Sequence, residues 1–142
     1  MTLAVRLDVR DATGSVLVDL VADPVSLAEA PVRQDLGTAS ILIDTPHQIL
    51  VNKLCALLSR SELRDLVDVK ALLDAGCDLE RALVDCPRQD AGFSPLTLSW
   101  ALNGLAIQPL ATRLGWPAAR TGELEHFRDD LVARVLAAAR PG

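Results

Sequence analysis

The stretch from Pro46 to Asp68, PHQILVNKLCALLSRSELRDLVD, decides how this chain folds. It follows Thr45 directly, so a helix-capping threonine precedes a proline at the first helical position, which is a usual start of an α-helix. Leucines then recur at helical spacing, as is typical of an amphipathic helix that packs on a core. We expect one helix over 46–59 and a second over 62–75, which Gly76 ends.

Helix signals continue to the end of the chain. Ser61 is the expected cap of the second helix, and Asp78 is expected to cap a short third helix that Pro87 ends. Ser94, followed by a proline, opens a further helix, and prolines and a glycine break up residues 106–120. A final amphipathic helix has one apolar face, formed by Leu124, Phe127, Leu131, Val135 and Ala138.

The beginning of the chain predicts strands. Residues 3–9 and 15–21 are rich in valine and leucine, and the turn-forming residues Asp11–Gly14 lie between them, so we expect a β-hairpin. The second strand is apolar on both faces except at Asp19. This pattern favours a strand that is covered on two sides, and it is expected to end at Asp23–Pro24.

The rest of the first 45 residues completes the predicted architecture. We expect residues 24–38 to form a loop and residues 40–43 to form a third short strand. The fold class is therefore α+β, with a small antiparallel β-sheet followed by an α-helical bundle. We place the two corresponding domains at 1–45 and 46–142.

Composition excludes several classes of protein. The 142 residues carry a net charge of −5, so a broad electrostatic surface for nucleic acid is not expected. Half of the residues are hydrophobic, which excludes a disordered chain. The three cysteines lack Cys-x-x-Cys spacing and are expected to be reduced core thiols. No apolar run is long enough for a secretory signal or a membrane span, so we expect a cytoplasmic protein without a membrane partner.

Two cations on the first predicted helix are candidate binding residues. Lys53 lies on the flank of the leucine stripe, and Arg60, seven residues later, lies on the same flank. They would form a local positive ridge. The alternative is that their aliphatic stems cover apolar surface while their charged heads remain in water.

Arg64 and Asp68 are spaced i, i+4 on the second predicted helix and face the same way. The alternative to a functional role is a surface ion pair that contributes about 0.3–0.5 kcal/mol. Helix stability favours an acid that precedes a base, and here the base comes first. The order of the two residues therefore favours a functional role.

Asp19 is a carboxylate within an apolar strand, so it is either a metal-binding group on the sheet or an edge residue that reaches solvent. Gly14–Ser15 precedes it, as in the Gly-Ser…Asp-x-Asp signature of nucleotidyltransferases. The gap is too short, however, and Val21 stands where the second acid is required. Gly14–Ser15 is therefore interpreted as part of the hairpin turn.

Residues 50–60 (LVNKLCALLSR) and 64–68 (RDLVD) resemble the C-terminal half of the nucleotidyltransferase AbiEii/AbiGii toxin family. The hairpin over 3–21 resembles the end of that family's nucleotidyltransferase sheet, which would make the predicted sheet a partial nucleotidyltransferase-like palm.

The resemblance also implies roles for individual residues. Lys53 would contact the triphosphate of an NTP, and Arg60, on the same predicted flank, is the second candidate for nucleotide binding. Asp68 would orient or deprotonate the acceptor, and Arg64 would position Asp68 or a phosphate. Asp19 would be a third catalytic acid and a ligand of Mg²⁺.

The resemblance further implies Mg²⁺-dependent transfer of a nucleotide from NTP to an RNA or protein acceptor, and an antitoxin partner. The chain lacks the family's Gly-Ser and Asp-x-Asp motifs. We therefore expect a truncated, split or degenerate nucleotidyltransferase that is inactive alone and binds Mg²⁺ only if another segment or chain completes the site. The alternatives are a non-catalytic interaction or dimerisation module and a nucleotide-binding regulator.

Overall fold

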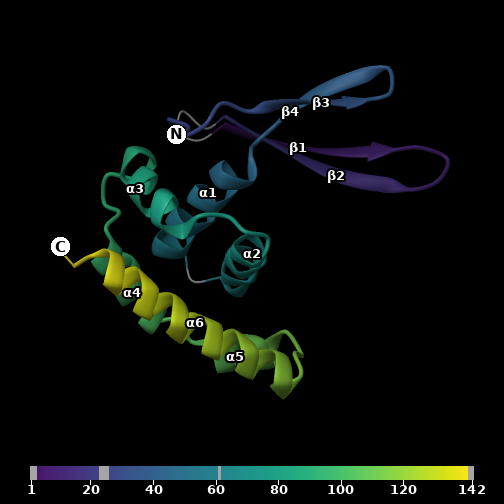
Figure 1. Ribbon diagram of the computed structural model, residues 1–142. Coiled ribbons are helices and arrows are strands. Elements are labelled where there is room, and N and C mark those ends of the chain that lie inside the picture. Colours follow the sequence, from purple (N-terminus) through teal and green to yellow (C-terminus); the bar gives the residue numbers. More distant parts are fainter. Residues whose placement is uncertain (1–2, 23–25, 61, 141–142) are drawn as a thin grey trace.

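The computed structural model describes residues 3–22, 26–60 and 62–140, in which four strands precede six helices (Figure 1). The α+β class is confirmed. Ser61 and Asp23–Pro24, the expected helix cap and strand end, lie outside the described residues. The strands are β1 (Leu3–Arg10), β2 (Ser15–Ala22), β3 (Val32–Leu36) and β4 (Ala39–Ile43). The helices are α1 (Pro46–Ser59), α2 (Leu63–Asp74), α3 (Leu79–Gln89), α4 (Pro95–Asn103), α5 (Ile107–Arg113) and α6 (Ala118–Ala138).

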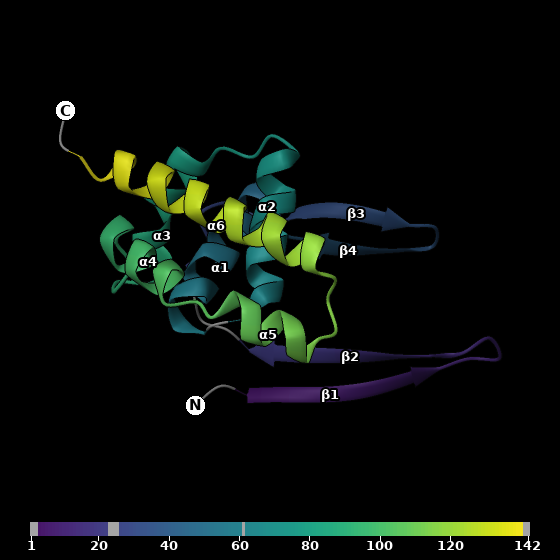
Figure 2. The same cartoon turned by 90° about the horizontal axis from the view of Figure 1, so that it is seen from below.

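The strands form two separate antiparallel hairpins, β1–β2 and β3–β4, which extend from the same side of the helices (Figures 1 and 2). The register of β1–β2 places eight apolar side chains on one face. They are Leu3, Val5, Leu7 and Val9 from β1, and Val16, Val18, Leu20 and Ala22 from β2. The expectation that the second strand is covered on two sides is wrong, because its side chains are exposed except for half-buried Val18.

Strand β3 corrects the expected loop over 24–38. A two-residue turn, Gly37–Thr38, connects Leu36 to its partner Ala39. Gly37 adopts a φ of 70°, which glycine reaches without the steric cost that a side chain would cause. A glycine at the first position of a two-residue turn is the sequence signal that could have identified this hairpin.

The boundaries of α1 and α2 agree with the helix signals. The Thr45 side chain accepts a hydrogen bond from the Gln48 backbone N–H, which satisfies a free donor in the first turn of α1. Beyond α2, Gly76 has a φ of 93°, and its N–H donates to the Leu73 carbonyl. The neighbouring Cys77 N–H donates to the Leu72 carbonyl, so the helix ends in a left-handed cap.

Two prolines that are expected to interrupt helices lie within their terminal turns. Helix α3 continues past Pro87 to Gln89, because a proline in the last turn removes only one backbone hydrogen bond. Pro109 lies in the first turn of α5, where backbone N–H groups have no partner within the helix. The segment over 106–120 is therefore partly helical.

Helix α1 lies among α2, α3 and α4, and the long helix α6 runs across α4 and α5 (Figures 1 and 2). Branched and small apolar side chains fill the space between them. The fully buried members are Leu50, Val51, Leu54, Leu66, Val69, Ala82, Cys86, Leu98, Leu131 and Val135. None of the described helices is both long enough and apolar enough to cross a membrane.

Candidate functional site

Lys53 on α1 faces α2 and contacts two carboxylates there. Its Nζ lies 2.5 Å from Asp68 Oδ2 and 3.0 Å from Asp65 Oδ1. The Lys53 side chain is 23% exposed, whereas Asp65 is fully buried and Asp68 is 39% exposed. The lysine therefore links a buried carboxylate to one that solvent and ligands can reach.

Arg60 approaches the same buried carboxylate from the end of α1. Its Nε lies 2.8 Å from Asp65 Oδ2, and its Nη2 lies 3.0 Å from Asp65 Oδ1. A guanidinium that donates two parallel hydrogen bonds to one carboxylate is both strongly bound and fixed in orientation. Arg60 follows α1 in an extended backbone conformation, so it does not share a helical flank with Lys53 as predicted. The two cations nevertheless converge on Asp65.

The cations determine the charge state of this cluster. Burial disfavours the ionised form of Asp65, but the hydrogen bonds and charges of Arg60 and Lys53 outweigh burial and hold its pKa below the usual value. The hydrogen bond to Asp68 is the main cause of the raised pKa of Lys53, and Asp65 adds to it against the effect of burial. The cluster therefore holds two cations and ionised Asp65 at neutral pH.

Asp65 is the central residue of the cluster, and it is not among the site residues predicted from the sequence. It lies on α2 beside Leu66 and one turn before Val69, both of which are fully buried. A carboxylate on the apolar face of a helix requires a charged or hydrogen-bonding partner. That position, together with a lysine, Lys53, on the preceding helix, is the sequence signal that could have identified Asp65.

The other predicted site residues lie apart from this cluster. The Arg64 side chain is 74% exposed, and its nearest carboxylate is Glu62, at 3.5 Å. Asp19 lies on the exposed β1–β2 hairpin, where Arg6 from the facing strand donates two hydrogen bonds to it, at 2.6 and 3.0 Å. The structure therefore brings together Lys53, Arg60 and Asp68, but it gives neither Arg64 nor Asp19 a contact with them.

An open cleft of about 680 Å³ lies beside Arg60. Its lining residues include Asn52 and Ser59 of α1 and two carboxylates, those of Asp44 and Asp90. Arg60 is the only cation among the described residues that line it. Such a cleft can accept a ligand that carries a phosphate at the Arg60 end and hydroxyl groups near the two carboxylates.

The carboxylates predicted for catalysis do not fit a Mg²⁺ site in their observed environment. Mg²⁺ requires several oxygen ligands in octahedral geometry. Both oxygens of Asp19 are occupied by Arg6, and one oxygen of Asp68 is paired with Lys53. Both oxygens of the neighbouring Asp65 are occupied by Arg60 and Lys53. Within residues 3–22, 26–60 and 62–140, no three His, Cys, Asp or Glu side chains form a group that could hold a metal ion.

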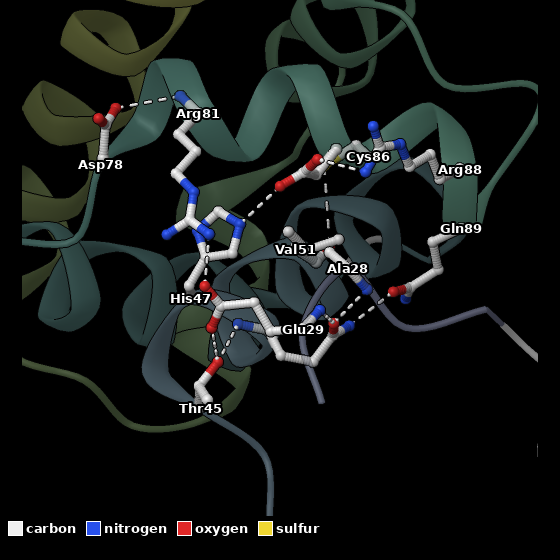
Figure 3. Close-up of polar contacts among 12 residues, drawn as sticks. Ala28, Glu29, Thr45, His47, Val51, Asp78, Arg81, Cys86, Arg88 and Gln89 are labelled. Atoms are coloured by element: carbon white, nitrogen blue, oxygen red, sulfur yellow. Dashed lines mark hydrogen bonds and ion pairs between the residues drawn. The ribbon is translucent and has the colours of Figure 1, made fainter. Parts of the chain in front are cut away.

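A second polar cluster joins the start of α1 to α3 (Figure 3). His47 Nε2 lies 2.8 Å from Asp85 Oδ2, and both side chains are nearly buried. Glu29 accepts hydrogen bonds from the Thr45 hydroxyl and from Arg81 Nη2. This cluster fastens the chain segment before β3 to the helices.

Gln48 completes that attachment from a fully buried position. Its Oε1 accepts hydrogen bonds from the backbone N–H groups of Ala28, at 2.6 Å, and Glu29, at 3.1 Å. Its Nε2 donates to Asn52 Oδ1 and Gln89 Oε1. Gln48 therefore positions Asn52, a residue that lines the cleft beside Arg60.

Comparison with known proteins identifies one family. The family model described as "Nucleotidyl transferase AbiEii toxin, Type IV TA system" matches residues 2–137, which is most of the chain. No curated protein and no solved structure matches the chain.

Proposed function

We propose, from the premise that this chain belongs to the AbiEii nucleotidyl transferase toxin family, that its Lys53–Arg60 cluster binds the triphosphate of an NTP. The observation that supports this most directly is the convergence of both cations on buried Asp65. Asp65 fixes the orientation of Arg60 through Nε and Nη2. The third guanidinium nitrogen of Arg60, Nη1, has no hydrogen-bond partner among the described residues and can donate to a phosphate.

The cleft beside Arg60 suggests how the remainder of the nucleotide lies. With the phosphates at Arg60, the ribose would lie toward Asp44 and Asp90, whose carboxylates can accept hydrogen bonds from its hydroxyl groups. Asp68, half-exposed and held by Lys53, would face the acceptor, which we propose is an RNA or a protein. The family description also implies that an antitoxin accompanies the toxin.

Binding of ATP, measured by isothermal titration calorimetry, tests this proposal. We expect Lys53→Ala and Arg60→Ala each to weaken binding at least tenfold, because each removes a cation from the triphosphate site. Lys70, the other lysine of the chain, and Arg134 on α6 supply matched controls, and Lys70→Ala and Arg134→Ala should bind ATP like the wild type. Equal affinity across all four variants would contradict the proposal.

The ion pairs of the carboxylates affect whether the isolated chain can catalyse nucleotide transfer. Asp19, Asp65 and Asp68 are each within ion-pair distance of a cation. We therefore expect the isolated chain to bind NTP without transferring a nucleotide. Mg²⁺-dependent labelling of RNA or protein by the purified chain, which the Asp68→Asn variant fails to catalyse, would show that it is a complete enzyme.

A second candidate function, a self-association module, is favoured by the β1–β2 hairpin. One face of this hairpin presents eight apolar side chains and no charge, so two copies of the face can meet without burying a charged group. A dimer that forms as the protein concentration rises, detected by sedimentation velocity, is the expected result. A monomer at all concentrations would exclude this function.

A further inference from the structure

A cavity of about 590 Å³ lies between α2, α5 and the connection from α5 to α6. Its volume is within the range of pockets that hold small organic molecules. The apolar part of its wall is formed by Leu63, Val67, Leu110, Leu114 and Trp116. The cavity is separate from the cleft beside Arg60, and the two have no lining residue in common.

Three arginines, Arg64, Arg113 and Arg120, line the same cavity, and Glu62 is its one carboxylate among the described lining residues. Arg64 lies 3.5 Å from Glu62. Within the part of the chain that the structure describes, neither Arg113 nor Arg120 has a carboxylate within ion-pair distance, although the protein as a whole is acidic. The other described arginines except Arg140 all have such a partner, and they are Arg6, Arg10, Arg33, Arg60, Arg81, Arg88, Arg128 and Arg134.

Arg120 is held in place by an aromatic ring. Its guanidinium carbon lies 3.7 Å from the centroid of the Trp116 ring. Stacking of this kind uses the face of the guanidinium and leaves the N–H groups at its edge available as donors. The cavity therefore combines an apolar wall with an oriented donor group and excess positive charge.

We propose that this cavity binds a small organic anion, with an apolar acyl or aryl body against the leucines and an anionic head group at the arginines. Charge complementarity supports this class of ligand, because three cations face one carboxylate at the rim. A neutral apolar ligand would leave the arginines without a counterion, and a bare inorganic anion would leave the apolar wall uncovered. The proposal is independent of NTP binding, since it uses neither Lys53 nor Arg60.

Trp116 provides a direct readout of occupancy. The chain has two tryptophans, and Trp100 is 80% exposed on α4, so Trp100→Phe leaves Trp116 as the only tryptophan without disturbing the core. In this background we would titrate octanoate, an acyl anion, and benzenesulfonate, an aryl anion, and record Trp116 emission. The neutral analogues 1-octanol and benzenesulfonamide and inorganic phosphate serve as comparison ligands.

We expect a saturable change in Trp116 emission with octanoate or benzenesulfonate, and the anion with the lower Kd identifies the body that the cavity prefers. The neutral analogues and phosphate should bind at least tenfold more weakly. Arg113→Gln and Arg120→Gln should each raise the Kd at least fivefold, whereas Arg134→Gln on α6 should leave it unchanged. No saturation with either anion, equal binding of the neutral analogues, or an unchanged Kd in both arginine variants would overturn the proposal.

Discussion

Arg60 and Asp65 form a bidentate ion pair, with Arg60 Nε 2.8 Å from Asp65 Oδ2 and Arg60 Nη2 3.0 Å from Asp65 Oδ1. The Asp65 side chain is fully buried, whereas the Arg60 side chain is half-exposed. The arginine therefore reaches from solvent to a carboxylate that solvent cannot reach. Arg60 directly follows α1 and Asp65 lies in the first turn of α2, so the pair joins the end of one helix to the start of the next. The pair defines the orientation of the cations that we assign to nucleotide binding.

Asp65→Asn is expected to destabilise the protein by about 3 kcal/mol, because it leaves two cations facing a buried group without charge. Asp68→Asn is the matched control on the same helix. It should cost less than about 1 kcal/mol, since Asp68 is partly exposed and, among the described residues, forms an ion pair with Lys53 alone. Urea denaturation followed by circular dichroism measures both values. Equal losses for the two variants would contradict the central role of Asp65.

The ionisation of Asp65 should also be visible in the pH dependence of stability. The pKa of Asp65 is lowered in the folded protein, so the unfolded chain binds more protons in acid. Its contribution to stability is present above the unfolded value of about 3.9 and is lost as the pH falls through the lower, folded value. We expect the urea midpoint of the wild type to fall more steeply below pH 4 than that of Asp65→Asn. Parallel curves would mean that another group dominates acid unfolding.

Lys53 should contribute to the pH dependence of stability in the opposite direction, at alkaline pH. Its pKa is raised in the folded protein, so its stabilising effect is complete below the unfolded value of about 10.4 and is lost as the pH rises through the folded value. Lys53→Met should therefore flatten the loss of stability between pH 10 and pH 12, as measured by urea midpoints. Because other groups titrate in this range, the comparison is with the wild type at each pH.

Gln48→Leu should detach the segment before β3 from the helices. The substitution removes the acceptor of two backbone N–H groups, those of Ala28 and Glu29, and is expected to cost about 2 kcal/mol. Hydrogen exchange of these two amides should become faster in the variant. Gln108→Leu on α5 is the control, because Gln108 is exposed and its side chain donates a hydrogen bond to Glu125, which is not part of this anchor. Unchanged exchange at residues 28 and 29 would contradict the anchoring role.

The apolar face of β1–β2 should drive self-association. Leu7→Lys places a charge on that face, and Leu17→Lys places the same charge on the opposite face of the hairpin. Both positions are exposed, so neither change should unfold the helices. Sedimentation velocity should show weaker association for Leu7→Lys than for Leu17→Lys. Equal association of the two variants would show that the apolar face does not drive self-association.

The sequence predicted the helices better than the strands, because helix ends carry their own chemistry. The Thr45–Pro46 pair and Gly76 marked the limits of α1 and α2 to within a residue. Strand β3 has no such marker except Gly37, and its short run of mixed residues has no apolar alternation that is clear on its own. Pro87 is expected from the sequence to end α3, but it lies in the last turn of that helix, where a proline is tolerated.

The candidate site was predictable in part. Periodicity brought Lys53 and Arg60 together, although Arg60 follows α1 rather than lying on its flank, and the resemblance placed Asp68 near them. Asp65 could not be predicted in the same way, because its partners, Lys53 on α1 and Arg60 just after α1, lie outside its own helix. For Arg64, spacing alone could not show that its side chain turns toward the α5 cavity, since that depends on how α5 packs against α2. The catalytic roles of Asp68, Arg64 and Asp19 stay predictions.

The division of the strands into two hairpins affects how the chain assembles. Each strand pairs with its immediate neighbour, β1 with β2 and β3 with β4, so no pairing has to wait for the closure of a long loop. Both hairpins can therefore form while the helices that follow them are still being synthesised. The packing of α6 onto α4 and α5 instead joins segments that lie farther apart in the sequence, so it requires the closure of a longer loop.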